Sequence, residues 1–296
     1  MDGIYTRRLV SYNVEADERA HVYLAIPRKL NGKAPAVVAL HGTWRGRGKD
    51  RTASLFGNPE NAYLDHLARR GYVVIAPDHF VSGHRIPPEG ANDTTRFYKK
   101  LPEWTAVGKF TYEHSIAVDV LQSLKEVDPE RIGTLGHSLG GHGAICLAAY
   151  DERVKAAVCN CGLSPFRHDR GVEGWAGDRW YVYFKHIRPG LLAGKLPSID
   201  FHEIISLIAP RAFLDLTALN DEGMGGAAPL RQRQVVLMNV KIMDVYELEK
   251  VPQNFAFYVH GRGHSVAYES RQLMYGWMDT HLKPPAATKP RRVNTN

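Results

Sequence analysis

Hydrophobic and polar residues alternate in two segments near the start of the chain, residues 6–13 and 21–26. Such alternation places the apolar side chains on one face of a β-strand. The polar residues 15–18 between the two segments predict a turn, so we expect an antiparallel hairpin. Six later segments are apolar without alternation, which is typical of strands buried on both faces. They are residues 36–40, 72–76, 132–135, 154–158, 212–216 and 255–259.

Helical patterns lie between these apolar segments. The clearest are Asn61–Arg70 before Gly71, Tyr112–Val127 ending before Pro129, Leu139–Tyr150, and a closing helix at Ala267–Leu282. Strand and helix therefore alternate along most of the chain. This order predicts an α/β fold with a mostly parallel central sheet and helices on both of its faces.

Two connections, residues 78–110 and 163–209, are too long for simple loops. Long connections in compact enzymes usually form lids or binding surfaces. The second follows the sixth predicted strand and is rich in aromatic residues: Trp175, Trp180, Tyr181, Tyr183 and Phe184. Either it forms a cap over a cleft or the aromatic residues anchor it to the core. We expect one α/β domain at residues 1–283, with a cap at 163–209, and a flexible basic tail at 284–296.

Composition excludes several classes of protein. The 296 residues are 44% hydrophobic and 23% charged, as in water-soluble globular proteins. No apolar segment is long enough for a signal peptide or a membrane span, so we expect a cytoplasmic protein with no membrane partner. The net charge is +7, but the basic residues are scattered, so no nucleic-acid partner is expected. A homodimer is left open.

The three cysteines, Cys146, Cys159 and Cys161, form no paired CxxC motif. Neither disulfides nor a metal site is therefore expected. Cys159 and Cys161 end an apolar segment, where cysteine usually behaves as a small buried hydrophobic residue.

Residues 136–140 read Gly-His-Ser-Leu-Gly, a match to the G-x-S-x-G nucleophile elbow. A predicted strand precedes the motif and a predicted helix follows it, as the elbow requires. The glycines relieve crowding where the chain reverses, and the turn exposes the serine hydroxyl. Ser138 is therefore the predicted nucleophile, and a structural glycine turn is the alternative.

A serine nucleophile needs a base, usually a histidine oriented by a carboxylate. His264 lies after the last predicted strand and before the closing helix, and His260 is the alternative base. Asp221 follows the strand at 212–216, at the carboxyl end where catalytic residues gather in open α/β sheets. Glu222 is the alternative acid, whereas Asp215 lies within the strand and is expected to be structural.

An oxyanion hole needs two backbone donors. The elbow itself supplies the N–H of Leu139, and the segment His41-Gly42-Thr43-Trp44 after an early strand supplies Thr43, with Trp44 as second choice. A plain turn at His41-Gly42 is the alternative. We expect the substrate to be bound by Trp44, His137, Trp175 and Trp180.

The chain resembles the α/β-hydrolase superfamily, and within it the dienelactone-hydrolase-like and acetyl-xylan-esterase-like serine hydrolases. The resemblance rests on His41-Gly42, Ala76-Pro77-Asp78, residues 128–132, the elbow at 136–141, residues 218–221 and Gly263-His264. It implies the same triad and oxyanion roles, no cofactor, and a small-molecule carboxylic ester as substrate. Dienelactone hydrolases in the narrow sense use cysteine as nucleophile, so Ser138 departs from them.

The sequence thus predicts a serine hydrolase that cleaves carboxylic esters through an acyl-enzyme intermediate. One alternative is a peptidase or amidase similar to the prolyl oligopeptidases, and another is a non-catalytic protein that only binds a ligand in the cleft. Basic residues of the segment after the strand at 36–40 and of the connection 163–209 are either solvated charges or a site for an anionic acid or sugar. They are Arg45, Arg47, Lys49, Arg51, Arg167, Arg170 and Arg179.

Overall fold

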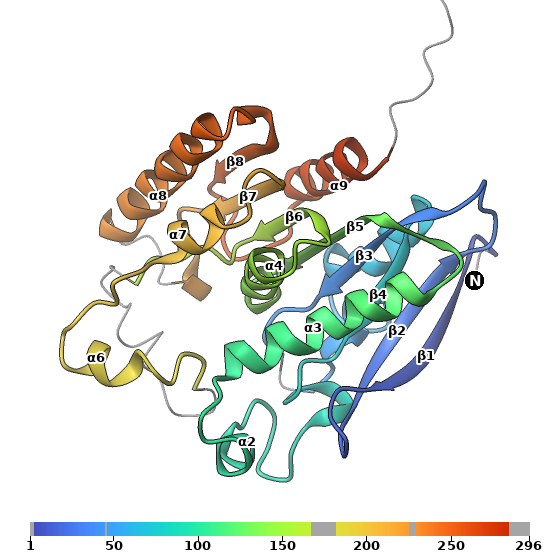
Figure 1. The fold of residues 1–296 in the computed structure, drawn as a ribbon, viewed down its shortest axis with the longest axis horizontal. Coiled ribbons are helices and arrows are strands. Elements are labelled where there is room, and N and C mark those ends of the chain that lie inside the picture. Colours follow the sequence, from blue (N-terminus) through green and yellow to red (C-terminus); the bar gives the residue numbers. More distant parts are fainter. Residues whose placement is uncertain (1–2, 45, 167–181, 225–228, 284–296) are drawn as a thin grey trace, which may run out of the picture.

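An eight-stranded sheet forms the centre of the molecule (Figure 1). The computed structural model describes residues 3–44, 46–166, 182–224 and 229–283. The strand order is β1-β2-β4-β3-β5-β6-β7-β8, in which β2 pairs antiparallel with β1 and β4 and all later pairings are parallel. The predicted α/β fold is confirmed. The strands are β1 (Tyr5–Asn13), β2 (Arg19–Pro27), β3 (Ala34–Leu40), β4 (Val73–Pro77), β5 (Val127–His137), β6 (Val154–Asn160), β7 (Ala212–Ala218) and β8 (Phe255–His260).

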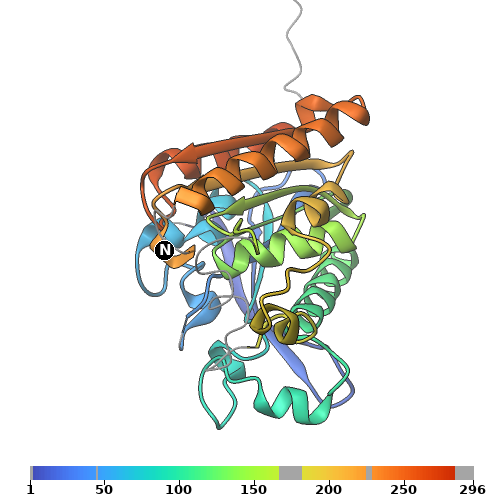
Figure 2. The same cartoon turned by 90° about the vertical axis from the view of Figure 1, so that its left-hand side faces the viewer.

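Helices cover both faces of this sheet (Figure 2). One face packs against α3 (Ala106–Ser123), α4 (Leu139–Tyr150), α7 (Phe201–Ser206) and α8 (Pro229–Leu248). The other packs against α1 (Tyr63–Arg69) and α9 (Tyr268–Leu282). Within β3, Val38 and Leu40 face the first core while Val37 and Ala39 face the second. Burial on both sides is why these strands are apolar without alternation.

The structure corrects the predicted helix Tyr112–Val127 at both ends. The helix α3 begins at Ala106, where the Thr105 hydroxyl accepts a hydrogen bond from the N–H of Gly108 and caps the first turn. It ends at Ser123, because Val127 already pairs with Ala34 as the first residue of β5.

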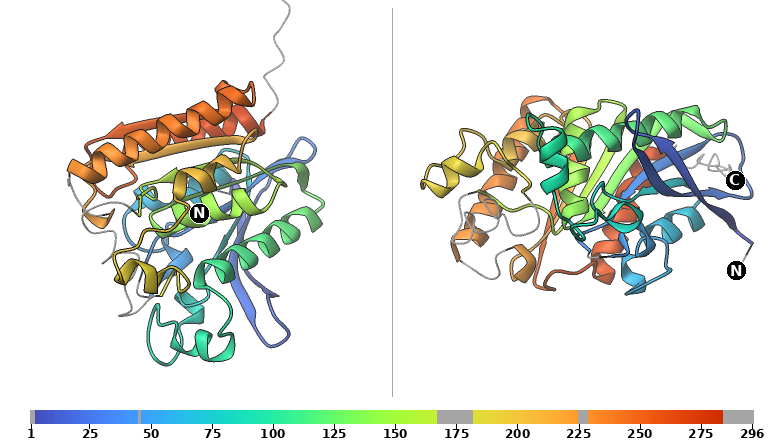
Figure 3. Two further views of the ribbon diagram at one scale, coloured as in Figure 1. Left: turned by 60° about the vertical axis from the view of Figure 1, so that its left-hand side comes forward. Right: turned by 90° about the horizontal axis from the view of Figure 1, so that it is seen from below.

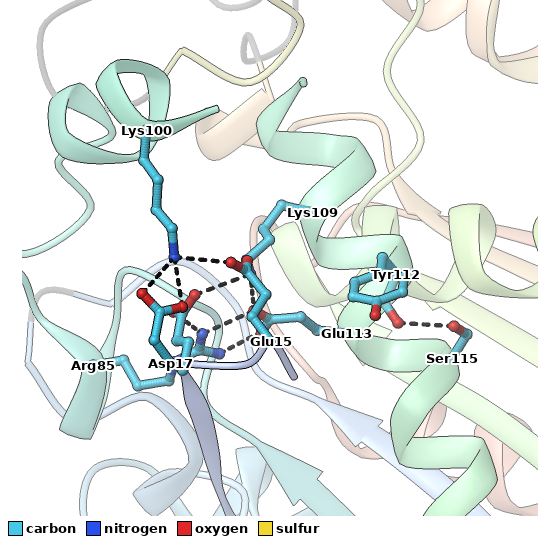
Figure 4. A network of polar contacts seen from close by, with 9 residues as sticks. Glu15, Asp17, Arg85, Lys100, Lys109, Tyr112, Glu113 and Ser115 are labelled. Atoms are coloured by element: carbon cyan, nitrogen blue, oxygen red, sulfur yellow. Dashed lines mark hydrogen bonds and ion pairs between the residues drawn. The ribbon is translucent and has the colours of Figure 1, made fainter. Parts of the chain in front are cut away.

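A cluster of ion pairs fastens the long segment 78–110 to the N-terminal hairpin (Figure 4). Its central cation, Lys109 on α3, is buried and lies 3.0 Å from both Glu18 and Glu113. Arg85 contacts Glu18 and Glu113, Lys109 also contacts Glu15, and Lys100 of α2 (Thr95–Lys100) lies 2.8 Å from Asp17. Buried cations need such partners, so the cluster explains why lysine is tolerated inside α3.

The second long segment is described only in part. Residues 167–181, with Trp175, Trp180 and Tyr181, lie outside the described residues, as does the tail at 284–296. The described part contains α6 (Arg188–Leu192) and leads into α7. It lies on the side of the molecule that comes forward in the left panel of Figure 3. Tyr183 and Phe184 pack on each other, with ring centroids 4.6 Å apart, and Phe184 lies 6.2 Å from Phe201 of the core. These two aromatic residues thus anchor the segment, and the cap remains a prediction.

None of the helices in the described part of the chain is long and apolar enough to cross a membrane.

Candidate active site

Ser138 stands on a sharp turn between β5 and α4. Its backbone has φ 59° and ψ −122°, a strained conformation for a residue with a side chain. The Ser138 N–H donates to the carbonyl oxygen of Asn160 (2.9 Å), and its own carbonyl accepts from the N–H of His142 (3.1 Å). These two hydrogen bonds hold the turn in place.

The glycines of the elbow are required by close backbone contacts. A Cβ on Gly136 would lie 2.8 Å from the Cα of Gly140. A Cβ on Gly140 would lie 2.8 Å from the carbonyl oxygen of His41 and closer still to that of Leu40. Because glycine has no side chain at these two positions, β3, β5 and α4 can approach closely enough to expose Ser138 at the carboxyl edge of the sheet.

A histidine–carboxylate pair lies at the same edge. The Nδ1 atom of His264, in the loop between β8 and α9, is 2.7 Å from Oδ1 of Asp221, which follows β7. Asp221 is fully buried and also accepts a hydrogen bond from the N–H of Met224 (3.0 Å). Burial raises the pKa of the Asp221 carboxyl, but the hydrogen bond and charge of His264 outweigh it and hold the pKa below its usual value. Asp221 is therefore a carboxylate near neutral pH.

The alternative residues lie elsewhere. His260 ends β8, where its Nδ1 atom accepts a hydrogen bond from the N–H of Arg262. Glu222 begins a short 3₁₀ turn (Glu222–Met224) and is exposed. Asp215 is buried within β7 and accepts hydrogen bonds from Thr217 and Asn239, as expected of a structural carboxyl group.

A pocket of about 310 Å³ joins Ser138 and His264. Three predicted residues, Thr43, Trp44 and His137, also line it. The other lining residues are Gly42, Arg51, Asn58, Glu60, Asn61, Ser265 and Val266. The structure thus brings Ser138, His264 and the loop after β3 together. Asp221 does not line the pocket but contacts His264.

Two backbone N–H groups are available beside the serine. Leu139 is the first residue of α4, and the first N–H groups of a helix have no acceptor within it. Gly42 approaches the elbow closely, since a Cβ there would lie 3.3 Å from the Cβ of Ser138. Within the described residues the next N–H, that of Thr43, makes no hydrogen bond.

His137 and Asn160 form a support that the sequence did not reveal. The amide nitrogen of Asn160 lies 2.8 Å from Nδ1 of His137 and donates to the carbonyl oxygen of Ser265 (3.0 Å). Burial lowers the pKa of His137 to about 3, so the ring is neutral and its Nδ1 accepts the hydrogen bond. The rings of His137 and His264 lie 4.6 Å apart. Asn160 thereby connects the elbow to the loop that carries His264. In the sequence, the only indication of this role was that a polar residue ends an apolar strand.

Arg231 is a second residue that sequence reasoning missed. It lies on α8, is fully buried, and donates from Nη1 to the carbonyl oxygen of Ala218 (3.1 Å). Its charge also lowers the pKa of Asp221. No local pattern marks Arg231, because its role depends on how α8 packs behind β7.

One group of side chains in the described residues has atoms close enough to hold a metal ion: Cys161, Asp221 and His264, within 4.8 Å of one another. Burial raises the pKa of the Cys161 thiol, with the Asp221 charge adding to the effect. This shift favours the thiol over the thiolate, which is the form that binds metal ions. Cys159 and Cys161 are both buried, as predicted.

The basic residues of the loop after β3 differ in their surroundings. Lys49 is buried and contacts Asp78, so the interpretation as a solvated charge is wrong for it. Arg47 packs on Phe56 and Arg51 on Trp44. Arg45, Arg167, Arg170 and Arg179 lie outside the described residues.

A serine elbow facing a histidine–carboxylate pair, at the carboxyl edge of a mostly parallel sheet, is the arrangement of the α/β-hydrolases. The fold is shared with a glucuronoyl esterase from Solibacter usitatus, at a TM-score of 0.73 and 17% identity over 95% of this chain and 83% of that one. A protein of Bacteroides fragilis described as a candidate acetyl xylan esterase gives a TM-score of 0.66 and 18% identity over 88% of this chain and 67% of that one.

Sequence comparison identifies the family within this class. Residues 20–173 match the dienelactone hydrolase family. The predicted hydrolase YtaP of Bacillus subtilis (strain 168) is 33% identical over 219 residues, which are 71% of this chain and 68% of that protein. The chain belongs to the dienelactone hydrolase family. The prediction of a hydrolase that acts on carboxylic esters is thereby confirmed.

Proposed function

We propose that the protein hydrolyses small carboxylic esters with Ser138 as nucleophile, His264 as general base and Asp221 as the orienting acid. The observation that carries the proposal is the 2.7 Å contact between His264 and Asp221 beside the pocket that also holds Ser138. Nδ1 of His264 is occupied by the carboxylate, which leaves Nε2 as the basic nitrogen.

In the first step, His264 takes the proton of the Ser138 hydroxyl as its oxygen attacks the ester carbonyl carbon. The N–H groups of Leu139 and Thr43 stabilise the negative oxygen of the tetrahedral intermediate. His264 then gives the proton to the leaving alcohol, and an acyl-enzyme remains. In the second step His264 activates water, which releases the acid and restores Ser138. Asp221 stays ionised throughout and stabilises the imidazolium.

The names of the structural neighbours, a glucuronoyl esterase and a candidate acetyl xylan esterase, support an ester as the substrate. Two residues that line the pocket, Trp44 and the neutral His137, are available to contact the bound ester. The predictions of a cytoplasmic location, of no nucleic-acid or membrane partner and of a homodimer come from the sequence and stay predictions.

Comparing ester and amide forms of one substrate distinguishes the peptidase alternative.

The test is hydrolysis of 4-nitrophenyl esters from acetate to decanoate by the wild type, Ser138→Ala, His264→Gln and His260→Gln. We expect the first two variants to lose about three or more powers of ten in kcat. His260→Gln, which changes the alternative histidine, should retain most activity. Labelling by a fluorophosphonate should require Ser138 and distinguishes a catalytic serine from a ligand-binding cleft. Wild-type activity in Ser138→Ala would overturn the proposal.

A further inference from the structure

The helix α8 is apolar on two opposite sides. On its inner side Val235, Met238 and Ile242 are buried in the core on one face of the sheet. Its outer side also carries apolar side chains, each 38–44% exposed: Val236, Leu237, Val240 and Met243. A helix that is apolar around its circumference is normally buried on all sides. The composition of α8 therefore indicates that a further surface covers its outer side.

The outer side of α8 is placed where a large partner can reach it. The helix lies at the β8 end of the sheet, on the outside of the molecule (Figure 1). It contains 20 residues and is therefore about 30 Å long. The exposed apolar residues at positions 236–243 form one stripe, because helical residues three and four apart lie on the same side. An exposed apolar patch with charged residues at its rim is typical of a protein contact.

Two opposite charges lie at equal distances from Val240, the middle of the stripe. Arg233 precedes Val240 by seven residues and Glu247 follows it by seven. Seven residues are close to two helical turns, so both side chains lie on the same side as the stripe. Both are exposed, and neither forms an ion pair within the described residues. The surface is thus apolar at its middle, positive at one end and negative at the other.

We propose that the outer side of α8 is the interface of a homodimer, in which α8 packs antiparallel against its copy around a two-fold axis at Val240. In this arrangement Val240 meets its own copy and Leu237 meets the partner subunit's Met243. Arg233 lies against the partner subunit's Glu247, and symmetry forms the same pair a second time.

The charges argue for a second copy of this chain and for its direction. An antiparallel copy sets opposite charges against each other at both ends of the stripe, so the surface is complementary to itself. A parallel copy would set Arg233 against arginine and Glu247 against glutamate, and like charges disfavour an interface. Two packed helices bury less than the standard interface of about 1,600 Å², so we expect a reversible dimer with a dissociation constant of about 1–100 µM.

Sedimentation velocity at concentrations from about 1 to 200 µM tests whether α8 forms the interface. The wild type should shift from monomer to dimer over this range, whereas Val240→Glu should remain monomeric because it buries two carboxylates at the axis. Leu9→Glu is the matched control, since Leu9 is 53% exposed on β1 at the other end of the sheet. It should dimerise like the wild type. Hydrolysis of 4-nitrophenyl acetate and thermal unfolding show that each variant is folded.

A charge exchange tests the pairing of Arg233 with Glu247. We expect Arg233→Glu and Glu247→Arg each to raise the dissociation constant about tenfold or more, because each creates two pairs of like charges in the dimer. The double variant places both opposite charges back in contact and should return the dissociation constant to within about threefold of the wild-type value.

Disulfide crosslinking tests the direction of the two helices. In Val240→Cys, oxidation by copper phenanthroline and oxygen should remove the two thiol hydrogens and join the sulfurs across the axis, giving a covalent dimer on non-reducing gels. Leu248→Cys is the control, because Leu248 is 77% exposed on the same helix but lies eight residues from the axis. It should form little covalent dimer, as should the wild type.

Three results would each overturn the proposal. The first is a wild type that stays monomeric over the whole concentration range. The second is a dimer that survives Val240→Glu, or one whose affinity the double charge exchange fails to restore. The third is equal crosslinking of Val240→Cys and Leu248→Cys, which would exclude the antiparallel arrangement. If Val240→Glu is unfolded, the charge exchange and the crosslinking decide the matter, because those substitutions lie on the exposed side of α8.

Discussion

Lowering the pH from 7 to 5 should destabilise the protein through three buried histidines. Burial lowers the pKa of His114 to about 3, of His137 to about 3 and of His142 to about 4, from a usual value of 6.5. In the unfolded chain the same groups titrate near that usual value. Each folded-state pKa is therefore depressed, so the stabilisation is present above about pH 6.5 and is lost as the pH falls below it toward the folded pKa.

The magnitude follows from proton linkage. At pH 5 the protonated form of an unfolded histidine exceeds the neutral form about 30-fold, whereas the buried rings stay largely neutral. Relative to pH 7, each histidine costs the folded state about 2 kcal/mol, and the three together about 6 kcal/mol. That loss is comparable with the whole stability of a typical domain, about 5–15 kcal/mol. Partial unfolding near pH 5 is the expected result.

Urea denaturation followed by tryptophan fluorescence at pH 7, 6 and 5 measures the effect. The variant His114→Leu replaces one of the titrating rings by an apolar side chain of similar size. The Nδ1 atom of His114 makes no hydrogen bond within the described residues, so the replacement breaks none there. The pH-dependent loss should therefore shrink by about 2 kcal/mol in this variant. If the free energy of unfolding changed by less than about 1 kcal/mol between pH 7 and pH 5, the histidines would titrate normally and the argument from burial would fail.

Three further predictions concern the site and its supports. Asp221→Asn should lower kcat by about 10³- to 10⁴-fold in the 4-nitrophenyl ester assay, while the adjacent Glu222→Gln should retain activity. Gly140→Ala should destabilise the fold by about 3 kcal/mol or more in thermal unfolding, because the added Cβ meets backbone atoms of Leu40 and His41; Gly276→Ala in α9, where nothing lies within 4 Å, should be neutral or stabilising. Asp78→Asn leaves Lys49 buried without its carboxylate and should cost about 3–5 kcal/mol in urea denaturation, whereas breaking the exposed Arg96 pair by Glu89→Gln should have little effect.

The sequence was informative where one residue type alone satisfies the local physics. Apolar segments without alternation predicted the parallel strands, because burial on both faces leaves few other choices. The elbow was visible because Gly136 and Gly140 have no room for a side chain. Chain order then indicated His264 and Asp221, which the structure places 2.7 Å apart.

The sequence was less informative where contacts between distant segments decide the outcome. The start of α3 was missed because Lys109 interrupts the apolar pattern, and its partners Glu15 and Glu18 lie in the N-terminal hairpin. Arg231 and Asn160 act only through elements that pack beside β7 and β5, so local patterns did not mark them. Lys49 resembled a solvated loop charge because its partner, Asp78, follows a different strand.

The ion cluster in Figure 4 sets a lower limit on how far the chain can be shortened. The match to the dienelactone hydrolase family begins at residue 20, after Glu15 and Glu18. A fragment trimmed to that boundary would keep all the parallel strands and the elbow. It would also leave Lys109 and Arg85 with Glu113 as their one remaining acid in the cluster. We therefore expect the part of the chain needed for folding to extend before residue 20, so a permuted or shortened version of this enzyme should retain the first hairpin.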